Sequence, residues 1–300
     1  MTSGAVSGLQ LWQWRSQSQK SAIAAAIPPS EVDWLLQELT GLDRLSLRLD
    51  TYKSLPQVDL KVSFLELDGL WQQRIESRIP VQYLAGTASW RHFKLQVSPA
   101  VLIPRPETEE LIDLAIAATQ IDPSLQTGDW ADLGTGSGAI ALGLADALPH
   151  ATIHAVDRSQ AALAIAQQNA RTLGLSDRIR FYHGSWLEPL ASLKGNLKGV
   201  VANPPYIPSQ MVLDLQPEVL HEPHTALDGG IDGLDCIRHL VAVAPDYLQA
   251  DGVWMVEMMA GQSPQVIELL RQQRRYDRMA IHRDLAGVER FAIAHLQSFS

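Results

Sequence analysis

The segment Asn203-Pro204-Pro205-Tyr206 has the residue types needed to present a planar nitrogen for reaction. The nitrogen of a planar –NH2 group is a poor nucleophile because its lone pair is delocalised into the π system. The side-chain oxygen of Asn203 and the carbonyl oxygen of Pro204 can each accept one N–H, which aims the lone pair at an electrophilic methyl group. The prolines stiffen the segment, and Tyr206 can lie on the flat face of the substrate. The pattern therefore predicts methyl transfer to a planar nitrogen.

A glycine-rich turn, Gly134-Thr135-Gly136-Ser137-Gly138, follows Asp132-Leu133 where a strand-like run gives way to a helical one. Glycines allow a tight turn and the close approach of a ligand to the main chain. The turn also fits the dinucleotide fingerprint loosely, and a tight turn without a ligand is an alternative. A carboxylate at Asp132 would repel a pyrophosphate and attract an ammonium group. Together with the G-x-G-x-G spacing, this favours S-adenosylmethionine as the cofactor.

Two further side chains fit a nucleoside site. Asp157 ends the apolar run 152–156, and a carboxylate at the end of the second strand can accept both ribose hydroxyls. Its alternative role is to cap the helix that follows. Trp186 comes after the run 179–182 and could cover the face of an adenine, although a core or rim tryptophan fits the sequence equally well.

The alternation of strand-like and helix-like runs from Arg105 onward predicts the elements that position these residues. Strands are expected at 152–156, 179–182, 199–202, 253–257 and 291–295 and in the run that ends at Leu133, with helices at 108–118, 139–148, 160–173 and 264–275. Strands separated by helices form parallel β-α-β units. The fold class is therefore α/β, with a doubly wound sheet that binds ligands at the carboxyl ends of its strands.

The sequence before Arg105 predicts two different parts. Residues 1–86 have apolar side chains at helical spacing, which indicates a small helical bundle that recognises the substrate. In residues 87–104, Phe93, Leu95 and Val97 alternate with polar residues, and an apolar run at 101–103 follows Pro99. We expect a β-hairpin linker with its turn at Pro99, followed by a catalytic domain at 105–300.

Composition limits the partners and the compartment. Lys and Arg total 24 against 33 Asp and Glu, a net charge of −9, with about −8 in residues 87–300 and −1 in residues 1–86. An acidic chain lacks the basic field that holds a polyanion, so we expect no direct DNA binding. The chain shows no apolar run of membrane-spanning length and no signal sequence, and its single Cys236 fits a reducing compartment. We expect a cytoplasmic monomer that contacts no membrane and binds no metal.

The segments GTGSG, AVD, GSW and NPPY, in this order, resemble a methyltransferase that uses S-adenosylmethionine and acts on planar nitrogen. The further segments RPETEEL (105–111), EPHTALDGGIDGL (222–234) and DLAGVERF (284–291) resemble the PrmC/HemK family of protein-(glutamine-N5) methyltransferases. The resemblance covers roughly residues 80–300. It implies a mostly parallel, seven-stranded Rossmann-like sheet, methylation of the GGQ glutamine of peptide-chain release factors, and S-adenosyl-L-homocysteine as the product.

The same resemblance implies the roles of individual residues. The implied cofactor contacts are Asp132, Gly134, Thr135, Gly136, Ser137, Gly138, Asp157, Trp186 and Asn203. The implied catalytic residues are Asn203, Pro204 and Tyr206, and the implied substrate contacts are Asn203, Pro204, Pro205, Tyr206, Trp90, Arg105 and Glu107. The chain departs from the family at Met258-Met259-Ala260-Gly261, where the glycine spacing differs.

Three alternatives share these motifs. A ribosomal-protein glutamine methyltransferase would use the same chemistry on another protein, and an adenine-N6 methyltransferase of DNA or RNA would use the same loop. A catalytically inactive partner protein that binds S-adenosylmethionine is the third. The acidic composition argues against nucleic acid, and the candidate basic patch is Arg271, Arg274, Arg275 and Arg278, which at helical spacing also fits a solvated face.

Overall fold

The chain folds into two units in the computed structural model, which describes residues 4–298. One unit contains the chain up to Thr87 together with Gln216–His221, and the other contains Ala88–Leu215 together with the chain from Glu222 onward. The segment 216–221 therefore belongs to the first unit although its neighbours in sequence belong to the second. No helix within residues 4–298 has the length and apolar character that crossing a bilayer requires.

The second unit is built on a seven-stranded sheet with the strand order β10-β11-β9-β8-β5-β6-β7. The strands β5 to β9 pair in parallel, whereas β11 is antiparallel to β9 and β10 is antiparallel to β11. The strand bounds are β5 (Thr127–Leu133), β6 (His150–Asp157), β7 (Ile179–His183), β8 (Leu197–Ala202), β9 (Leu248–Glu257), β10 (Tyr276–Arg283) and β11 (Glu289–Leu296). The central strands are buried almost continuously, as expected where helices cover both faces.

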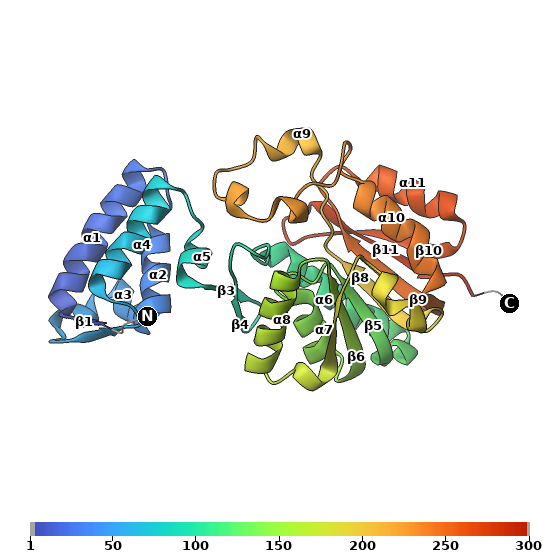
Figure 1. Cartoon of the computed structure of the whole chain (residues 1–300), viewed down its shortest axis with the longest axis horizontal. Helices are drawn as coiled ribbons and strands as arrows, with labels where there is room; N and C mark the ends of the chain where they lie inside the picture. The colour runs from blue at the N-terminus through green and yellow to red at the C-terminus, as the bar shows by residue number, and fades with distance from the viewer. Residues whose placement is uncertain (1–3, 299–300) are drawn as a thin grey trace. The chain divides into compact units, whose positions relative to one another are not determined.

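Helices cover both faces of this sheet (Figure 1). On one face lie α6 (Glu110–Ile121), α7 (Ala139–Ala147) and α8 (Gln160–Thr172), and on the other α10 (Asp235–Val243) and α11 (Ser263–Gln273). Because strand side chains alternate, Trp130 packs with the first group of helices and Ala131 with the second. A short helix, α9 (Ser209–Val212), follows β8. The 3₁₀ turns of this unit are 106–109, 123–126, 176–178, 188–193, 224–226 and 244–246.

The doubly wound Rossmann-like sheet expected from the sequence is confirmed. Strand β10 and helix α10 were not anticipated. Strand β10 lies at the edge of the sheet with most of its side chains partly exposed, and a break in its register further obscures the alternation. The helix expected at 264–275 ends at Gln273, and Arg274 adopts a left-handed conformation with φ 58°.

The hairpin expected at 87–104 forms, but with different strands and a different turn. Its strands are β3 (Thr87–Trp90) and β4 (Phe93–Gln96), so the turn lies at Arg91-His92, where Arg91 has φ 50°. The expected strand at 101–103 is absent from the described hairpin. Pro99 does lie in a turn, closed by a hydrogen bond from Val101 N to Ser98 O, but the turn follows β4. The alternation of Ala88 and Trp90 was the missed signal.

The first unit is helical, with one pair of short strands that the sequence did not suggest. Its helices are α1 (Gly8–Ala24), α2 (Ser30–Thr40), α3 (Arg44–Arg48), α4 (Phe64–Glu76) and α5 (Val81–Ala85), with 3₁₀ turns at 51–54 and 219–221. Strands β1 (Gly4–Val6) and β2 (Val58–Leu60) pair antiparallel. Within this unit, the guanidinium of Arg74 is almost fully buried and bonds Glu31 at 2.6 and 3.0 Å and Glu218 at 2.9 Å. Glu218 thereby fixes the segment 216–221 to α4.

Candidate functional site

The sequence motifs meet at one edge of the seven-stranded sheet. Leu133, the last residue of β5, lies beside Val156 of β6 and Ala202 of β8, and Asp157 of β6 lies beside His183 of β7. These strands are parallel, so the segments that follow them emerge at the same edge. The glycine turn, Asp157, the tryptophan segment and the Asn203–Tyr206 loop are therefore neighbours in space although about 70 residues of sequence separate them.

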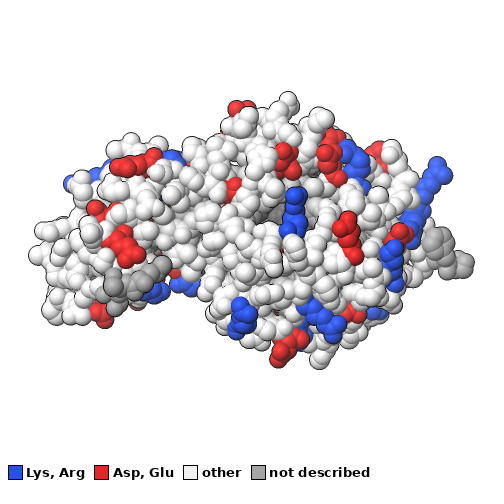
Figure 2. Space-filling view, in the orientation of Figure 1, with Lys and Arg blue, Asp and Glu red and all other residues white. Residues whose placement is uncertain are grey.

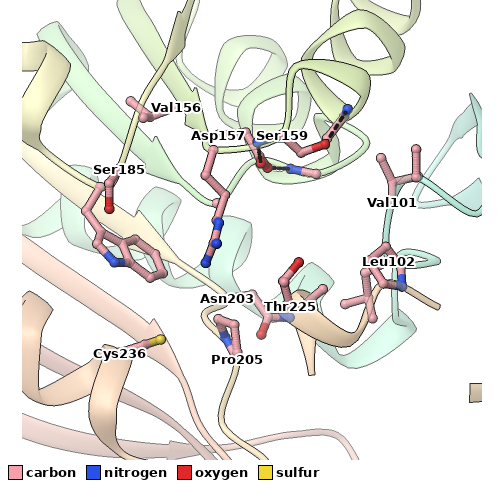
Figure 3. Close-up of a pocket in the computed structure, with 18 of the residues that line it drawn as sticks. Val101, Leu102, Val156, Asp157, Ser159, Ser185, Asn203, Pro205, Thr225 and Cys236 are labelled. Atoms are coloured by element: carbon pink, nitrogen blue, oxygen red, sulfur yellow. Dashed lines mark hydrogen bonds between the residues drawn. The ribbon is translucent and has the colours of Figure 1, made fainter. Parts of the chain in front are cut away.

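A cavity of about 340 Å³ lies at this edge, within the second unit. Its volume is in the range of small-molecule sites. Figure 3 shows Asp157, Asn203, Pro205 and Cys236 around the cavity, and Gly134, Gly136 and Trp186 also line it. Two further segments complete the wall, residues 100–102 and residues 223–226, and none of their residues was among the predicted site residues. The cavity thus joins the residues expected to bind the cofactor and the residues expected to bind the substrate.

The glycine turn is held from behind by a buried carboxylate. Gly134 and Gly136 adopt positive φ values of 79° and 55°, a conformation that favours glycine, and both face the cavity. One oxygen of Asp132, Oδ2, accepts hydrogen bonds from Thr135 Oγ1 at 2.6 Å and from Ala141 N at 2.9 Å. The other, Oδ1, is buried without a partner in the described structure. Burial raises the pKa of Asp132 to about 7.

Asp157 and Trp186 form one wall of the cavity. The Asp157 carboxylate accepts a hydrogen bond from Gly136 N at 2.9 Å and another from Ser159 N at 2.8 Å. Each oxygen keeps acceptor capacity for a ligand hydroxyl. The cap of α8 is Ser159, whose hydroxyl accepts from Ala162 N at 3.2 Å, so Asp157 is not the capping side chain. Trp186 has φ 48°, and its ring lies beside Gly134.

The Asn203–Tyr206 loop is joined to Thr108 and Glu257 by a continuous set of hydrogen bonds. Asn203 Nδ2 donates to Thr108 Oγ1 at 3.0 Å, and Thr108 Oγ1 donates to Glu257 Oε2 at 2.7 Å. The Tyr206 hydroxyl donates to the second oxygen, Glu257 Oε1, at 3.0 Å. Burial raises the pKa of Glu257 to about 7, and burial together with the Glu257 charge raises the pKa of Tyr206.

The same loop is supported on its other side by the segment that follows residue 222. Ile207 N donates to Leu227 O and Gly229 N donates to Ile207 O, which makes a short parallel bridge. The backbones approach so closely that a Cβ on Gly229 would lie 2.8 Å from the Pro205 carbonyl oxygen. Gln262, which is nearly buried, donates to the Tyr206 carbonyl at 3.0 Å. Gln262 directly follows the divergent residues 258–261, and its hydrogen bond to the Tyr206 carbonyl is present despite the altered glycine spacing.

Several residues expected at the site lie outside the cavity wall. They are Asp132, Thr135, Ser137, Gly138, Pro204, Tyr206, Trp90, Arg105 and Glu107. Thr135 and Asp132 bond each other behind the turn. The Ser137 carbonyl accepts from buried Asn169 at 2.9 Å, and Gly138, with φ 87°, is the N-cap residue of α7. These residues support the turn from behind.

Trp90, Arg105 and Glu107 occupy three different environments. Trp90 is 1% exposed, packs in the core and donates its indole N–H to the Arg105 carbonyl at 2.9 Å, so a substrate could reach it only if this core opened. The Arg105 guanidinium bonds the buried Glu222 carboxylate at 2.7 Å, which connects the RPETEEL and EPHTALDGG segments. The Glu107 charge helps raise the pKa of Glu257.

Four residues at the site or behind it were not predicted from the sequence: Thr108, Glu257, Glu222 and Arg158. Thr108 and Glu222 lie inside segments that were recognised as motifs, and Glu257 ends an expected strand. The sequence does not distinguish a buried polar partner at these positions from a helix-starting or strand-ending residue. Arg158 lines the cavity directly after Asp157. Within the described residues, no group of three or more His, Cys, Asp or Glu side chains is arranged to hold a metal ion.

Comparison with known proteins agrees with the fold. The family model described as "Methyltransferase small domain" matches residues 115–232. Among solved structures, the catalytic domain of hMettl16 in complex with MAT2A 3'UTR hairpin 6 superposes with a TM-score of 0.55 at 13% identity. That superposition covers 79% of this chain and 81% of the other, and it shows a shared fold. The second unit therefore has the fold of a methyltransferase domain.

Curated relatives identify the family. The release factor glutamine methyltransferase of Synechocystis sp. is 48% identical over 99% of this chain and 100% of its own length. The protein of the same name from Thermosynechococcus vestitus is 49% identical over 88% of this chain and 90% of its own length. This chain belongs to the family of release factor glutamine methyltransferases. The resemblance drawn from the sequence motifs is thereby confirmed.

Proposed function

We propose that this protein transfers a methyl group from S-adenosylmethionine to the side-chain amide nitrogen, N5, of the glutamine in the GGQ motif of peptide-chain release factors. The observation that carries the proposal is the position of Asn203, which lines the same cavity as the glycine turn and Asp157. One cavity can therefore hold a nucleoside cofactor and a planar amide side by side. The names of the full-length relatives support a release factor as the substrate.

The cavity fits S-adenosylmethionine by its donors and acceptors. The Asp157 carboxylate, held by two backbone N–H groups, can accept the two ribose hydroxyls. Gly134 and Gly136 offer a backbone surface without side chains, and Trp186 offers an aromatic face for adenine. When bound, this cofactor supplies an electrophilic methyl group on a sulfonium sulfur.

The chain's own contribution is to position the amide nitrogen. Asn203 Nδ2 is engaged by Thr108, and no residue in the described range donates to Asn203 Oδ1, so this oxygen is available for one substrate N–H. The Pro204 carbonyl can accept the other N–H, because no donor within residues 4–298 uses it. With both hydrogens held, the nitrogen lone pair points along the remaining direction, toward the methyl group.

The reaction is a direct in-line displacement. The carbon–sulfur bond breaks as the carbon–nitrogen bond forms, and S-adenosyl-L-homocysteine leaves. The methylated nitrogen then loses one proton, which passes to solvent or to a carbonyl oxygen. Positioning and desolvation supply the acceleration, because no covalent intermediate is required.

The charge distribution supports a protein substrate over a nucleic acid. Residues 87–300 carry about −8, and the four arginines of the candidate basic patch do not share one helical face, because α11 ends at Gln273. Arg275 pairs with Asp246 at 2.5 Å, and Arg278 pairs with aspartates as well. Figure 2 shows acidic and basic side chains mixed over the visible face of the second unit, without a continuous basic stripe.

The remaining assignments complete the proposal. The helical residues 1–86 form the part that recognises the release factor, residues 87–104 form the linker and residues 105–300 the catalytic domain. The enzyme acts as a monomer in the cytoplasm, where release factors work, without binding metal, membrane or DNA. Gel filtration with light scattering measures the oligomeric state directly.

The decisive experiment supplies the protein with tritiated S-adenosylmethionine and three acceptors in parallel. These are a purified release factor, the same factor with its GGQ glutamine replaced by alanine, and duplex DNA. We expect label in the unaltered factor alone. Label in DNA, or equal label in the alanine variant, would overturn the proposal.

A further inference from the structure

Thr108 and Glu257 form a buried hydrogen-bonded group directly behind Asn203. The Thr108 side chain is 4% exposed and Glu257 is fully buried. They come from distant parts of the sequence, the 3₁₀ turn that precedes α6 and the last residue of β9. A buried carboxylate is costly unless it is hydrogen-bonded, and here each of its oxygens accepts a bond from a hydroxyl group.

The donors and acceptors of this group can be assigned by counting protons. An ionised carboxylate only accepts hydrogen bonds, so Thr108 must donate its single hydroxyl proton to Glu257. The Thr108 oxygen then has no proton left, so it can only accept a hydrogen bond from Asn203. The Asn203 atom that faces it must therefore be the –NH2 nitrogen, and the carboxamide oxygen must point the other way.

We propose that Thr108 and Glu257 are positioning residues that fix the orientation of the Asn203 carboxamide, so that its oxygen faces the substrate nitrogen. Rotation of this carboxamide by half a turn would present N–H groups to the N–H groups of the substrate, and the amide could not be held for reaction. The inference rests on the proposed function, because it takes a substrate amide as the group that Asn203 holds.

The charge of Glu257 controls this orientation. If Glu257 binds a proton, it must donate it, and Thr108 can then accept from Glu257 and donate to Asn203 Oδ1 instead. Thr108 and Tyr206 face Glu257, and their hydrogen bonds stabilise its negative charge. The Arg290 charge also stabilises it, whereas the Glu107 charge destabilises it. Burial is the largest influence and raises the pKa of Glu257 to about 7. The productive orientation is therefore favoured above about pH 7.

The test compares turnover of the intact protein and four variants on a purified release factor, with binding of S-adenosylmethionine measured by calorimetry. We expect Thr108→Val to lower kcat by about 100-fold, the size of effect produced by misplacing a reacting group, with the cofactor Kd within about threefold. Thr108→Ser retains the hydroxyl and should restore kcat to within about threefold of the unaltered protein. Thr119→Val removes a hydroxyl that bonds only the Ile116 carbonyl in the same helix, and serves as the matched control.

The pH dependence of kcat distinguishes a Glu257 that orients Asn203 from a Glu257 that only packs behind it. The unaltered protein should lose kcat as pH falls from 8 to 6, whereas Glu257→Gln, which cannot ionise, should show a lower kcat that changes little over this range. Thr108→Val with an unaltered kcat, or Glu257→Gln with the same acidic fall in kcat, would overturn the inference. If the unaltered protein methylates no release factor, the proposed function itself is wrong, so the two failures are distinguishable.

Discussion

The glycine turn after β5 and the Asn203–Tyr206 loop after β8 stand at the ends of neighbouring strands, and a buried carboxylate lies behind each. Asp132 and Glu257 are both fully buried, and burial raises the pKa of each to about 7. Their hydrogen bonds differ. Asp132 accepts both of its bonds on one oxygen, one of them from a backbone N–H, whereas Glu257 accepts one hydroxyl on each oxygen.

The difference follows from what each loop must present. The glycine turn presents backbone, so its carboxylate bonds the Ala141 N–H and the Thr135 side chain within the turn itself. The second loop presents a side chain whose two ends are chemically opposite, so its carboxylate must set the direction of hydrogen bonds through Thr108. A carboxylate that fixes a backbone shape can be replaced by another acceptor, whereas one that sets a direction also depends on its charge.

The largest effect is expected at the residue that the second carboxylate orients. Asn203→Ala removes an acceptor that holds the substrate nitrogen, and should lower kcat on the order of 10²–10³-fold, as loss of one preorganised hydrogen bond at a reacting group does. The Kd for S-adenosylmethionine should change by less than about threefold, since the Asp157 wall is untouched. Rapid-quench kinetics and calorimetry measure the two quantities.

The matched control for that experiment is Asn196→Ala, which alters an exposed asparagine whose side-chain amide bonds only the nearby Lys194 carbonyl. It should behave as the unaltered protein does. A near-normal methylation rate in Asn203→Ala would mean that two acceptors are not needed to hold the amide.

An intermediate effect, confined to cofactor binding, is expected on the Asp157 wall. Asp157→Asn keeps an oxygen for Gly136 N but loses the charge that strengthens bonds to ribose hydroxyls. A charge-assisted hydrogen bond contributes about 1.5–3 kcal/mol, so the Kd for S-adenosylmethionine should rise about 10- to 100-fold. The kcat at saturating cofactor should stay within about threefold. Calorimetry of this variant beside Asp177→Asn, an exposed aspartate, tests the prediction, and an unchanged Kd would remove Asp157 from the cofactor site.

The sequence was sufficient for the sheet because its central strands carry strong patterns. The runs that end at Leu133, Val156 and Ala202 are apolar and are each followed by a residue type with a recognisable role. Strand β10 lacks such a pattern, since it is a partly exposed edge strand. The turn of the hairpin was misplaced because Pro99 is a strong turn signal, whereas Arg91 adopts positive φ without being glycine.

At the site, the sequence was sufficient for residues that face the cavity and insufficient for residues behind them. Gly134 and Asn203 follow strands directly and Asp157 ends one, and position in a parallel sheet implies their edge. Trp90 was expected to touch substrate, yet it packs in the core, because aromatic character alone does not distinguish a binding face from a buried one. Thr108 and Glu257 lie 149 residues apart, and a hydrogen bond over that separation leaves no local pattern.

A small effect, measured as the Kd for S-adenosylmethionine by calorimetry, is expected at Asp132. Asparagine offers one carbonyl oxygen, which can accept both bonds that Asp132 Oδ2 now accepts, and its amide nitrogen would take the place of the unpartnered Oδ1. Asp132→Asn should therefore change the Kd for S-adenosylmethionine by less than about tenfold. A larger loss would mean that the Asp132 charge acts on the cofactor ammonium, as its position before the glycine turn suggests in the sequence.

The charge of Asp132 should instead be visible in the pH dependence of stability. Its pKa rises from 3.8 to about 7 on folding, so the folded protein binds the proton more tightly than the unfolded chain does. This carboxyl contributes stability below about pH 4, and the contribution is lost as pH rises through 7, with a slope of up to about 1.4 kcal/mol per pH unit.

Urea unfolding from pH 5 to 8 should show the unaltered protein losing stability relative to Asp132→Asn, with a constant difference above about pH 7. The control variant Asp177→Asn should parallel the unaltered protein. Burial raises the pKa of Glu257 to the same value, so Glu257→Gln should show the same trend in stability as Asp132→Asn. Of these variants, only Glu257→Gln should also lose the pH dependence of kcat. Parallel unfolding curves for all the proteins would mean that neither carboxyl holds its proton as burial requires.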